Sequence, residues 1–168
     1  MQDLSASVRR ATAADAQALA DLVNHAYAIE DFFVEGDRTR AAEIVEMMTR
    51  GTFLVLDRHG ASTLGGAVYV TITGHRGYFG MLAVGAGLQG RGLGKRLVRI
   101  AEAMCEAAGC TEMTMKIVNL REELGRWYRS LGYRVTGTAP YTGNRSVKLA
   151  CHFVEMARTL GMPAVLAA

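Results

Sequence analysis

The chain has 168 residues, half of them hydrophobic and 21% charged, a balance typical of one globular domain spanning residues 1–168. Its formal net charge of +3 is small and dispersed, which argues against a nucleic-acid-binding protein with a clustered basic face. No apolar run approaches the roughly 18 residues that span a bilayer, and residues 1–5 lack the features of a signal peptide. We therefore expect a cytoplasmic protein with neither a nucleic acid nor a membrane as partner.

The expected helices and strands alternate in an order typical of an α+β fold with a mixed sheet. They are a strand at 7–11, helices at 13–27 and 39–50, strands at 52–57, 64–73 and 78–84, a helix at 93–108, a strand at 112–118, a helix at 122–131, and strands at 133–137 and 150–157. Short glycine-containing turns within 52–84 predict an antiparallel meander. The strand–helix–strand run of 78–118 predicts a βαβ unit, because parallel neighbours need a long crossover connection. Residues 29–38 are expected to be irregular.

The three cysteines, Cys105, Cys110 and Cys151, are an odd number and include no C-x-x-C pair. This pattern indicates neither a disulfide framework nor a zinc site, so we expect no metal. Small core residues are the simplest interpretation of all three.

A glycine-rich turn, Gln89-Gly90-Arg91-Gly92-Leu93-Gly94, is the most informative segment of the chain. It follows an expected strand and opens an expected helix, and this is the arrangement that binds anions in many proteins. Glycines let the backbone approach a ligand closely, and the helix start offers unpaired N–H groups and a positive dipole end. Arg91 and Lys95 add full positive charges. The turn predicts a phosphate-binding site, with a solvated helix face as the alternative.

Two nucleotide-binding motifs compete for this turn. A mononucleotide P-loop would need glycine in place of Gln89 and serine or threonine in place of Arg96. Residues 85–90 spell G-x-G-x-x-G, but that dinucleotide motif should open a doubly wound parallel sheet, whereas here it follows a meander. The next expected strand also ends without an acidic residue to hold a ribose. A nicotinamide oxidoreductase is therefore disfavoured.

The third interpretation is the coenzyme A pattern Q/R-x-x-G-x-G. With Leu82-Ala83-Val84 four residues before it, the turn resembles the first signature of the GNAT superfamily of N-acetyltransferases. Residues 127–133, Trp-Tyr-Arg-Ser-Leu-Gly-Tyr, resemble the second signature, an aromatic-Tyr-x-x-Leu-Gly-aromatic run. Residues 119–128 resemble a subgroup with N-x-R-x-E-L-x-x-W-Y, in which the distance from asparagine to tyrosine is two residues longer than in the commoner form. The resemblance covers nearly the whole chain and implies a GNAT-like fold with acetyl-CoA as acyl donor.

The resemblance also implies roles for individual residues. Backbone groups of Leu82 and Val84 would pair with pantetheine and polarise the thioester carbonyl. Tyr128 would be the general acid for the leaving thiolate, because a phenol is protonated at neutral pH; core packing is the alternative. The implied cofactor-binding residues are Leu82, Ala83, Val84, Gln89, Gly90, Arg91, Gly92, Leu93, Gly94, Lys95 and Asn119. Trp127 and Tyr133 are expected in the core.

The general base is not evident, because residues 78–82 carry no carboxylate. Glu30, Asp31, His152 or a chain of waters could serve, or the amine could arrive neutral. Tyr27, Glu30 and Asp31 fall in the segment that tends to wall the acceptor site in this superfamily. Their acidic and aromatic character would suit a cationic amine with an apolar part, and a capped helix end packed by aromatics is the alternative.

We therefore expect an enzyme that transfers an acetyl group from acetyl-CoA to a primary amine of a small molecule or peptide. The amine would attack directly in a ternary complex, without a covalent enzyme intermediate. The alternative is a non-catalytic acyl-CoA-binding or sensing module, which would keep the glycine-rich turn but would not need Tyr128. A homodimer is compatible with either.

Overall fold

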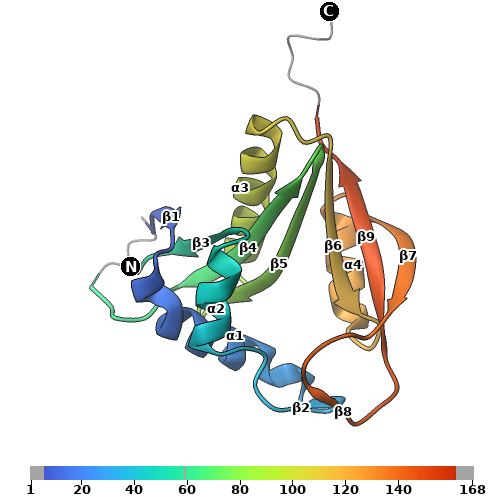
Figure 1. Ribbon diagram of the computed structural model, residues 1–168, viewed down its shortest axis with the longest axis horizontal. Coiled ribbons are helices and arrows are strands. Elements are labelled where there is room, and N and C mark those ends of the chain that lie inside the picture. The colour runs from blue at the N-terminus through green and yellow to red at the C-terminus, as the bar shows by residue number, and fades with distance from the viewer. Residues whose placement is uncertain (1–5, 59, 162–168) are drawn as a thin grey trace, which may run out of the picture.

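The computed structural model describes residues 6–58 and 60–161 and has the expected α+β architecture (Figure 1). Its elements are β1 (Val8–Arg10), a 3-10 turn (Ala13–Asp15), α1 (Ala16–Tyr27), a 3-10 turn (Ala28–Glu30), β2 (Val34–Glu35), α2 (Ala41–Met48), β3 (Thr52–Leu56), β4 (Gly66–Thr73), β5 (Arg76–Val84), α3 (Leu93–Ala107), β6 (Glu112–Val118), α4 (Glu122–Ser130), β7 (Arg134–Pro140), β8 (Ser146–Val147) and β9 (His152–Thr159). In this part of the chain no helix is long and apolar enough to cross a membrane.

The main sheet contains both of the predicted pairing patterns. Its strand order is β1-β3-β4-β5-β6-β9-β7, and β5 pairs with β6 in parallel while the other neighbours are antiparallel. The meander of β3, β4 and β5 and the βαβ unit of β5, α3 and β6 are thus confirmed. The small sheet of β2 and β8 was not predicted; β2 lies within residues 29–38, which were expected to be irregular.

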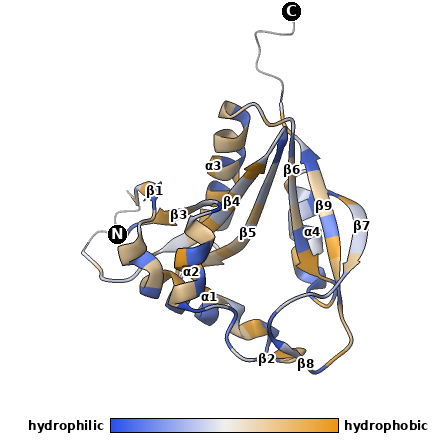
Figure 2. Ribbon diagram, in the orientation of Figure 1, coloured by the Kyte–Doolittle hydropathy of each residue, from blue (hydrophilic) through white to orange (hydrophobic). Residues whose placement is uncertain are grey.

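Helices cover both faces of the sheet. Successive residues of a strand point to opposite sides, so each strand contributes side chains to the layers on both faces. On β3, Phe53 and Val55 belong to the cluster packed by α1 and α2, whereas Leu54 and Leu56 belong to the cluster packed by α3 and α4. On α1 the buried residues are spaced as one helical stripe: Ala16, Leu19, Ala20 and Val23. Figure 2 shows hydrophobic residues along the strands and on parts of the helices that flank them.

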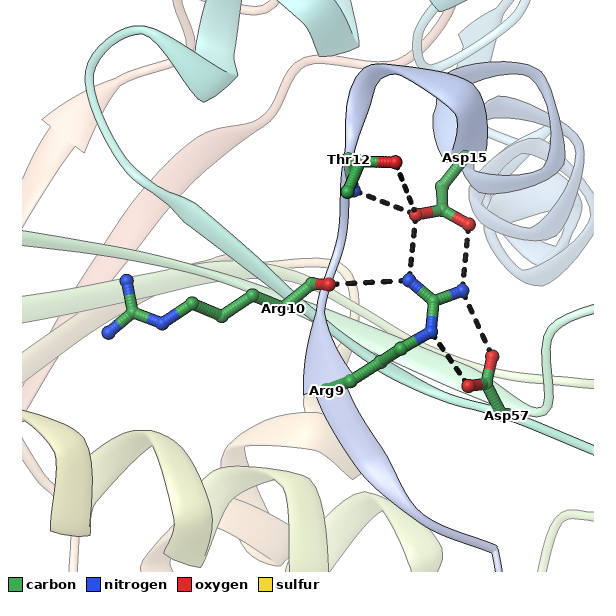
Figure 3. Close-up of polar contacts among 5 residues, drawn as sticks. All are labelled: Arg9, Arg10, Thr12, Asp15 and Asp57. Carbon is green, nitrogen blue, oxygen red and sulfur yellow. Dashed lines mark hydrogen bonds and ion pairs between the residues drawn. The ribbon is translucent and has the colours of Figure 1, made fainter.

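A branched ion pair fastens β1 to the rest of the fold (Figure 3). The guanidinium of Arg9 donates to Asp57 at the end of β3 (Nε to Oδ2, 2.7 Å) and to Asp15 before α1 (Nη2 to Oδ1, 2.9 Å). Asp15 also accepts the backbone N–H of Thr12 at 2.7 Å, as in a capping box. The hydrogen bond to Arg9 lowers the pKa of Asp15.

A buried carboxylate on α3 joins the helix to the far half of the sheet. Glu102, only 3% exposed, accepts hydrogen bonds from the Tyr133 hydroxyl at 2.7 Å, from Arg99 at 2.8 Å and from Arg158 of β9 at 2.7 Å. A carboxylate is retained in a core only when it is paired and hydrogen-bonded in this way. Tyr133 is therefore a core residue, as predicted, and its hydroxyl has a structural partner.

The central strands separate along their length, and this separation positions the candidate site. β5 and β6 pair only at Arg76–Glu112, Gly77–Met113 and Tyr78–Thr114, after which the two strands diverge (Figure 1). On the other side of β5, Met81 and Leu82 together stand opposite Val68 of β4, which defines a β-bulge. Met81 has a φ of +50°, the sole positive φ of a non-glycine residue among those described.

Candidate active site

The glycine-rich turn forms an open cradle at the start of α3. Gly90 and Gly92 have φ values of +75° and +76°, a conformation that residues with a Cβ rarely adopt. A Cβ built on either glycine would meet no atom within 4 Å, so the space that side chains would fill is open for a ligand. The predicted cradle therefore has the backbone conformation and the free space that a phosphate needs.

The start of α3 supplies donors to the same space. The first bond of the helix runs from the Arg96 N–H to the Gly92 carbonyl at 3.0 Å, so the amides before Arg96 have no partner inside the helix. The positive end of the helix dipole reinforces these amides for an anion. Arg91 and Lys95 are both exposed at the rim. Backbone and charge together fit the diphosphate of coenzyme A.

A cavity opens where β5 and β6 diverge. Because β5 pairs with β6 only as far as Tyr78, the backbone groups of residues 79–84 that face β6 have no strand partner within the described chain. Tyr27 from the end of α1, Leu82 from β5 and Tyr128 from α4 all line this inner cavity. The structure thus brings together Tyr27, predicted at the acceptor site, Leu82, predicted at the cofactor site, and Tyr128, predicted as the acid.

Tyr128 is held rigidly by aromatic neighbours. Its side chain is 4% exposed, and its ring centroid lies 4.7 Å from Trp127, 5.8 Å from Phe79 and 5.9 Å from Tyr133. Burial raises the pKa of the Tyr128 hydroxyl, which therefore keeps its proton. The hydroxyls of Tyr69 and Tyr133 donate to Met47 and Glu102, whereas within the described residues the Tyr128 hydroxyl makes no such hydrogen bond. A protonated donor without a protein partner is what a general acid in a cavity requires.

Glu30 lines the inner cavity but is not free to act as a base. One carboxylate oxygen accepts from Arg121 at 3.1 Å, and the other accepts from Arg145. Glu30 is 4% exposed, so the two guanidinium groups compensate a carboxylate that is removed from water. The acidic character that the sequence assigned to this wall is thereby neutralised, although the aromatic character is present in Tyr27, Tyr78 and Tyr141.

Three other predicted residues lie outside the inner cavity. Asp31 is exposed and lines a neighbouring outer cavity, where its backbone carbonyl accepts from Lys148 at 2.6 Å. His152 is exposed at the start of β9, and its backbone N–H donates to the side chain of Asn119 at 2.8 Å. Asn119 thus ties the end of β6 to β9, and its role with the cofactor stays a prediction.

Sequence reasoning missed three cations that line the inner cavity: Arg38, Lys116 and Arg145. Lys116 continues the polar alternation of Glu112 and Thr114 and is exposed, so the sequence pattern of β6 indicates only an ordinary surface lysine there. Arg38 and Arg145 lie in connecting segments without periodicity, where nothing local marks their direction. The lining is therefore rich in positive charge, contrary to the acidic wall expected for a cationic amine. Among the described residues no three His, Cys, Asp or Glu side chains gather as metal ligands would.

Comparisons with known proteins agree with this geometry. The profile of the acetyltransferase (GNAT) family matches residues 17–133. The structure of yncA from Salmonella typhimurium, described as an acetyltransferase with its cofactor acetyl-CoA, superposes with a TM-score of 0.71 at 21% identity, covering 95% of this chain and 96% of its own. The ribosomal-protein-S18-alanine N-acetyltransferase from Escherichia coli gives 0.73 at 14% identity, with 97% and 99% covered. The IAA acetyltransferase from Bacillus cereus gives 0.70 at 19% identity, with 93% and 100% covered. A comparison with curated protein sequences gives no match.

The family profile covers well over half of the chain, so the protein belongs to the acetyltransferase (GNAT) family. The predicted class, an acyl-CoA-dependent acyltransferase enzyme, is confirmed by that membership. The solved structures, at these low identities, confirm the GNAT fold.

Proposed function

We propose that the protein transfers an acetyl group from acetyl-CoA to a primary amine by direct attack in a ternary complex. The observation that carries the proposal is that two groups adjoin one divergent pair of strands. The phosphate cradle of residues 89–95 follows β5, and the protonated hydroxyl of Tyr128 lines the cavity between β5 and β6. An anion site and a proton donor in this arrangement match the needs of thioester aminolysis.

Different groups of the protein would bind and activate different parts of acetyl-CoA along the gap between β5 and β6. The cradle amides with Arg91 and Lys95 would hold the diphosphate, and the unpaired backbone of Leu82–Val84 would hold the pantetheine arm and polarise the thioester carbonyl. The amine nitrogen forms the new bond to the carbonyl carbon while the carbon–sulfur bond breaks. Tyr128 gives its proton to the departing thiolate, and the one proton that the neutral amine nitrogen loses on forming the amide restores the Tyr128 hydroxyl.

An ammonium would first have to lose a further proton to become a nucleophile, and the charges around the inner cavity bear on that earlier step. Glu30 has both oxygens occupied, and the other charged side chains that line the cavity are cations. Nearby positive charge lowers the pKa of an ammonium group and favours its neutral form. We therefore propose that the amine enters the cavity neutral, having released its proton to water, so that no carboxylate base is needed.

The proposal is tested by incubating the protein with acetyl-CoA and a panel of amines, with thiol release as the readout. Mass spectrometry of the product should show one added acetyl group, and resistance to hydroxylamine should distinguish an amide from an ester. Saturable transfer to at least one amine supports the proposal. Binding of acetyl-CoA without transfer to any class of amine would instead favour the non-catalytic acyl-CoA-binding module.

A further inference from the structure

Positive charge is in excess around the inner cavity. Its charged lining consists of Arg38, Lys116 and Arg145 against the single carboxylate of Glu30. Arg121 takes one oxygen of that carboxylate and Arg145 takes the other. The single negative charge of Glu30 is therefore shared between two arginines.

Two of the cations rest on aromatic rings instead of acidic partners. The Arg38 guanidinium lies 5.7 Å from the centre of the Tyr27 ring, and the Lys116 ammonium lies 4.3 Å from the centre of the Phe153 ring. In the described part of the chain neither cation forms an ion pair. An aromatic face positions a cation but leaves its charge and its hydrogen-bond donors available.

Arg145 also has a hydrogen-bond donor that is not satisfied by the protein. The residue is 7% exposed, and its Nε is buried without a hydrogen-bond partner among the residues that the structure describes. Buried polar groups are satisfied in nearly all cases, and an orphaned donor on a charged group is especially unfavourable. Arg145 also lines the outer cavity, as Arg38 does.

We infer that the acceptor amine carries a carboxylate, which Arg145 binds with the help of Arg38 and Lys116. A planar guanidinium pairs with a carboxylate through charge-assisted hydrogen bonds, so a carboxylate in the cavity offsets the excess charge. The aromatic side chains of Tyr27, Tyr78, Tyr141 and Phe153 give the acceptor an apolar wall. The inferred substrate class is an amino acid with an apolar side chain, and polyamines are excluded by like-charge repulsion. This inference rests on the proposed amine acetylation.

The direct test uses matched amines that differ only in the carboxylate. Phenylalanine is compared with phenethylamine, tyrosine with tyramine, and leucine with 3-methylbutylamine. We expect kcat/KM to be at least about tenfold higher for each amino acid, the effect of one charge-assisted interaction in a buried site. Equal or better use of the decarboxylated amines would overturn the inference and leave the proposed acetyl transfer intact.

Binding provides a readout that does not depend on transfer. The probe is 3-phenylpropionate, which keeps the ring and carboxylate of phenylalanine but has no amine. We expect it to raise the melting temperature of the acetyl-CoA complex, and phenethylamine to raise it less. If no amine is acetylated but 3-phenylpropionate still binds, the acid site stands and the proposed function falls. If 3-phenylpropionate gives no shift, the acid site is rejected.

Substitutions test whether the preference for amines with a carboxylate arises from the cations of the inner cavity. Arg38→Gln and Lys116→Gln should remove most of the preference for phenylalanine over phenethylamine. Arg40→Gln is the matched control for Arg38→Gln, because Arg40 lies two residues away with a 78% exposed side chain and outside the cavity lining. Arg145→Lys keeps a cation beside Glu30 but removes the guanidinium with its Nε. This variant should also reduce the preference for phenylalanine over phenethylamine. The inference would be contradicted if these variants lowered kcat/KM equally for phenylalanine and phenethylamine. An equal effect of Arg40→Gln on the preference would contradict it as well.

Discussion

The indole ring of Trp127 lies against Gly94, and a methyl group placed on Gly94 would sit 3.5 Å from the ring. Gly94 is in the first turn of α3, beside the phosphate cradle, whereas Trp127 is on α4 next to Tyr128. The same indole meets the Tyr128 ring edge-on, with centroids 4.7 Å apart. Trp127, expected only as a core residue, thus connects the proposed phosphate cradle to Tyr128, the proposed proton donor.

Trp127→Ala should therefore impair both parts of the site. Its half-buried ring supports α3 and Tyr128, so we expect weaker acetyl-CoA binding, slower transfer and a loss of about 2 kcal/mol in the free energy of unfolding. Titration with acetyl-CoA and chemical denaturation measure these effects. Trp127→Phe keeps a ring in place and should recover most of the acetyl-CoA affinity, the transfer rate and the stability. An alanine variant that binds acetyl-CoA with normal affinity would show that the contact is incidental.

Gly92→Val should weaken acetyl-CoA binding strongly while the protein still folds. The φ of +76° at Gly92 disfavours any side chain, and valine would occupy the open space where phosphate is expected. Gly109→Val is a matched control at the other end of α3, because Gly109 has a φ of +89° and equally open surroundings. Both variants should lose stability through backbone strain. Only Gly92→Val should lose affinity in calorimetric titration, and equal affinities would make the turn purely structural.

Tyr128→Phe should slow the chemical step by roughly 10²–10⁴-fold, the usual effect of losing a general acid. Since the hydroxyl has no hydrogen-bond partner among the described residues, thermal stability and acetyl-CoA affinity should change little. Single-turnover rates are the proper measurement, because product release can hide chemistry. A folded Tyr128→Phe enzyme with the wild-type single-turnover rate would remove Tyr128 from the mechanism.

The pH dependence of the same step offers a separate check. Burial raises the pKa of Tyr128 above the ordinary phenol value of 10.0, so its acid form persists further into the alkaline range. The single-turnover rate should therefore show no decline below about pH 10 that depends on Tyr128. A decline near neutral pH that disappears in Tyr128→Phe would contradict this assignment.

Arg9→Gln should lower the free energy of unfolding by about 1 kcal/mol and leave acetyl transfer unchanged, because the branched ion pair is partly exposed and distant from the site. Arg10→Gln is the control: its guanidinium points away from the cluster, and only its backbone carbonyl contacts Arg9 (Figure 3). The pKa of Asp15 is below its ordinary 3.8, so its contribution is present above about pH 4 and is lost as pH falls. The difference between wild type and Arg9→Gln should shrink accordingly in acid denaturation.

Elements with strong periodicity could be located from the sequence to within a residue or two. The strand at 112–118 was predicted at its observed bounds, and the helix expected at 93–108 ends one residue earlier. The pairing of β2 with β8 could not be predicted, because two-residue strands carry no alternation and their partners are far apart in sequence. The open conformation of the glycine-rich turn could be predicted, because it depends on local glycines, and its binding of phosphate stays a prediction.

The acceptor side of the site depends on contacts that no local pattern encodes. Glu30 is matched by Arg121 across 91 residues and by Arg145 across 115 residues. Taken alone, its segment appears acidic and suits a cationic amine. Only the folded chain shows that the acid is neutralised and that unmatched cations surround it. Charge in a cavity is a sum over distant segments, which explains the different expectation from the sequence.

The divergence of β5 from β6 also bears on how the protein could be inhibited. Beyond Tyr78 and Thr114, both strands present backbone N–H and C=O groups to the gap without a strand between them. An elongated molecule with regularly spaced amides could pair with these groups as an added strand does in a sheet. Resistance to such a compound would be hard to acquire, because most side-chain replacements leave the backbone groups where they are. Escape would require a proline in one of the two strands or a rearrangement that closes the gap, which would also exclude the pantetheine arm that we propose to lie there.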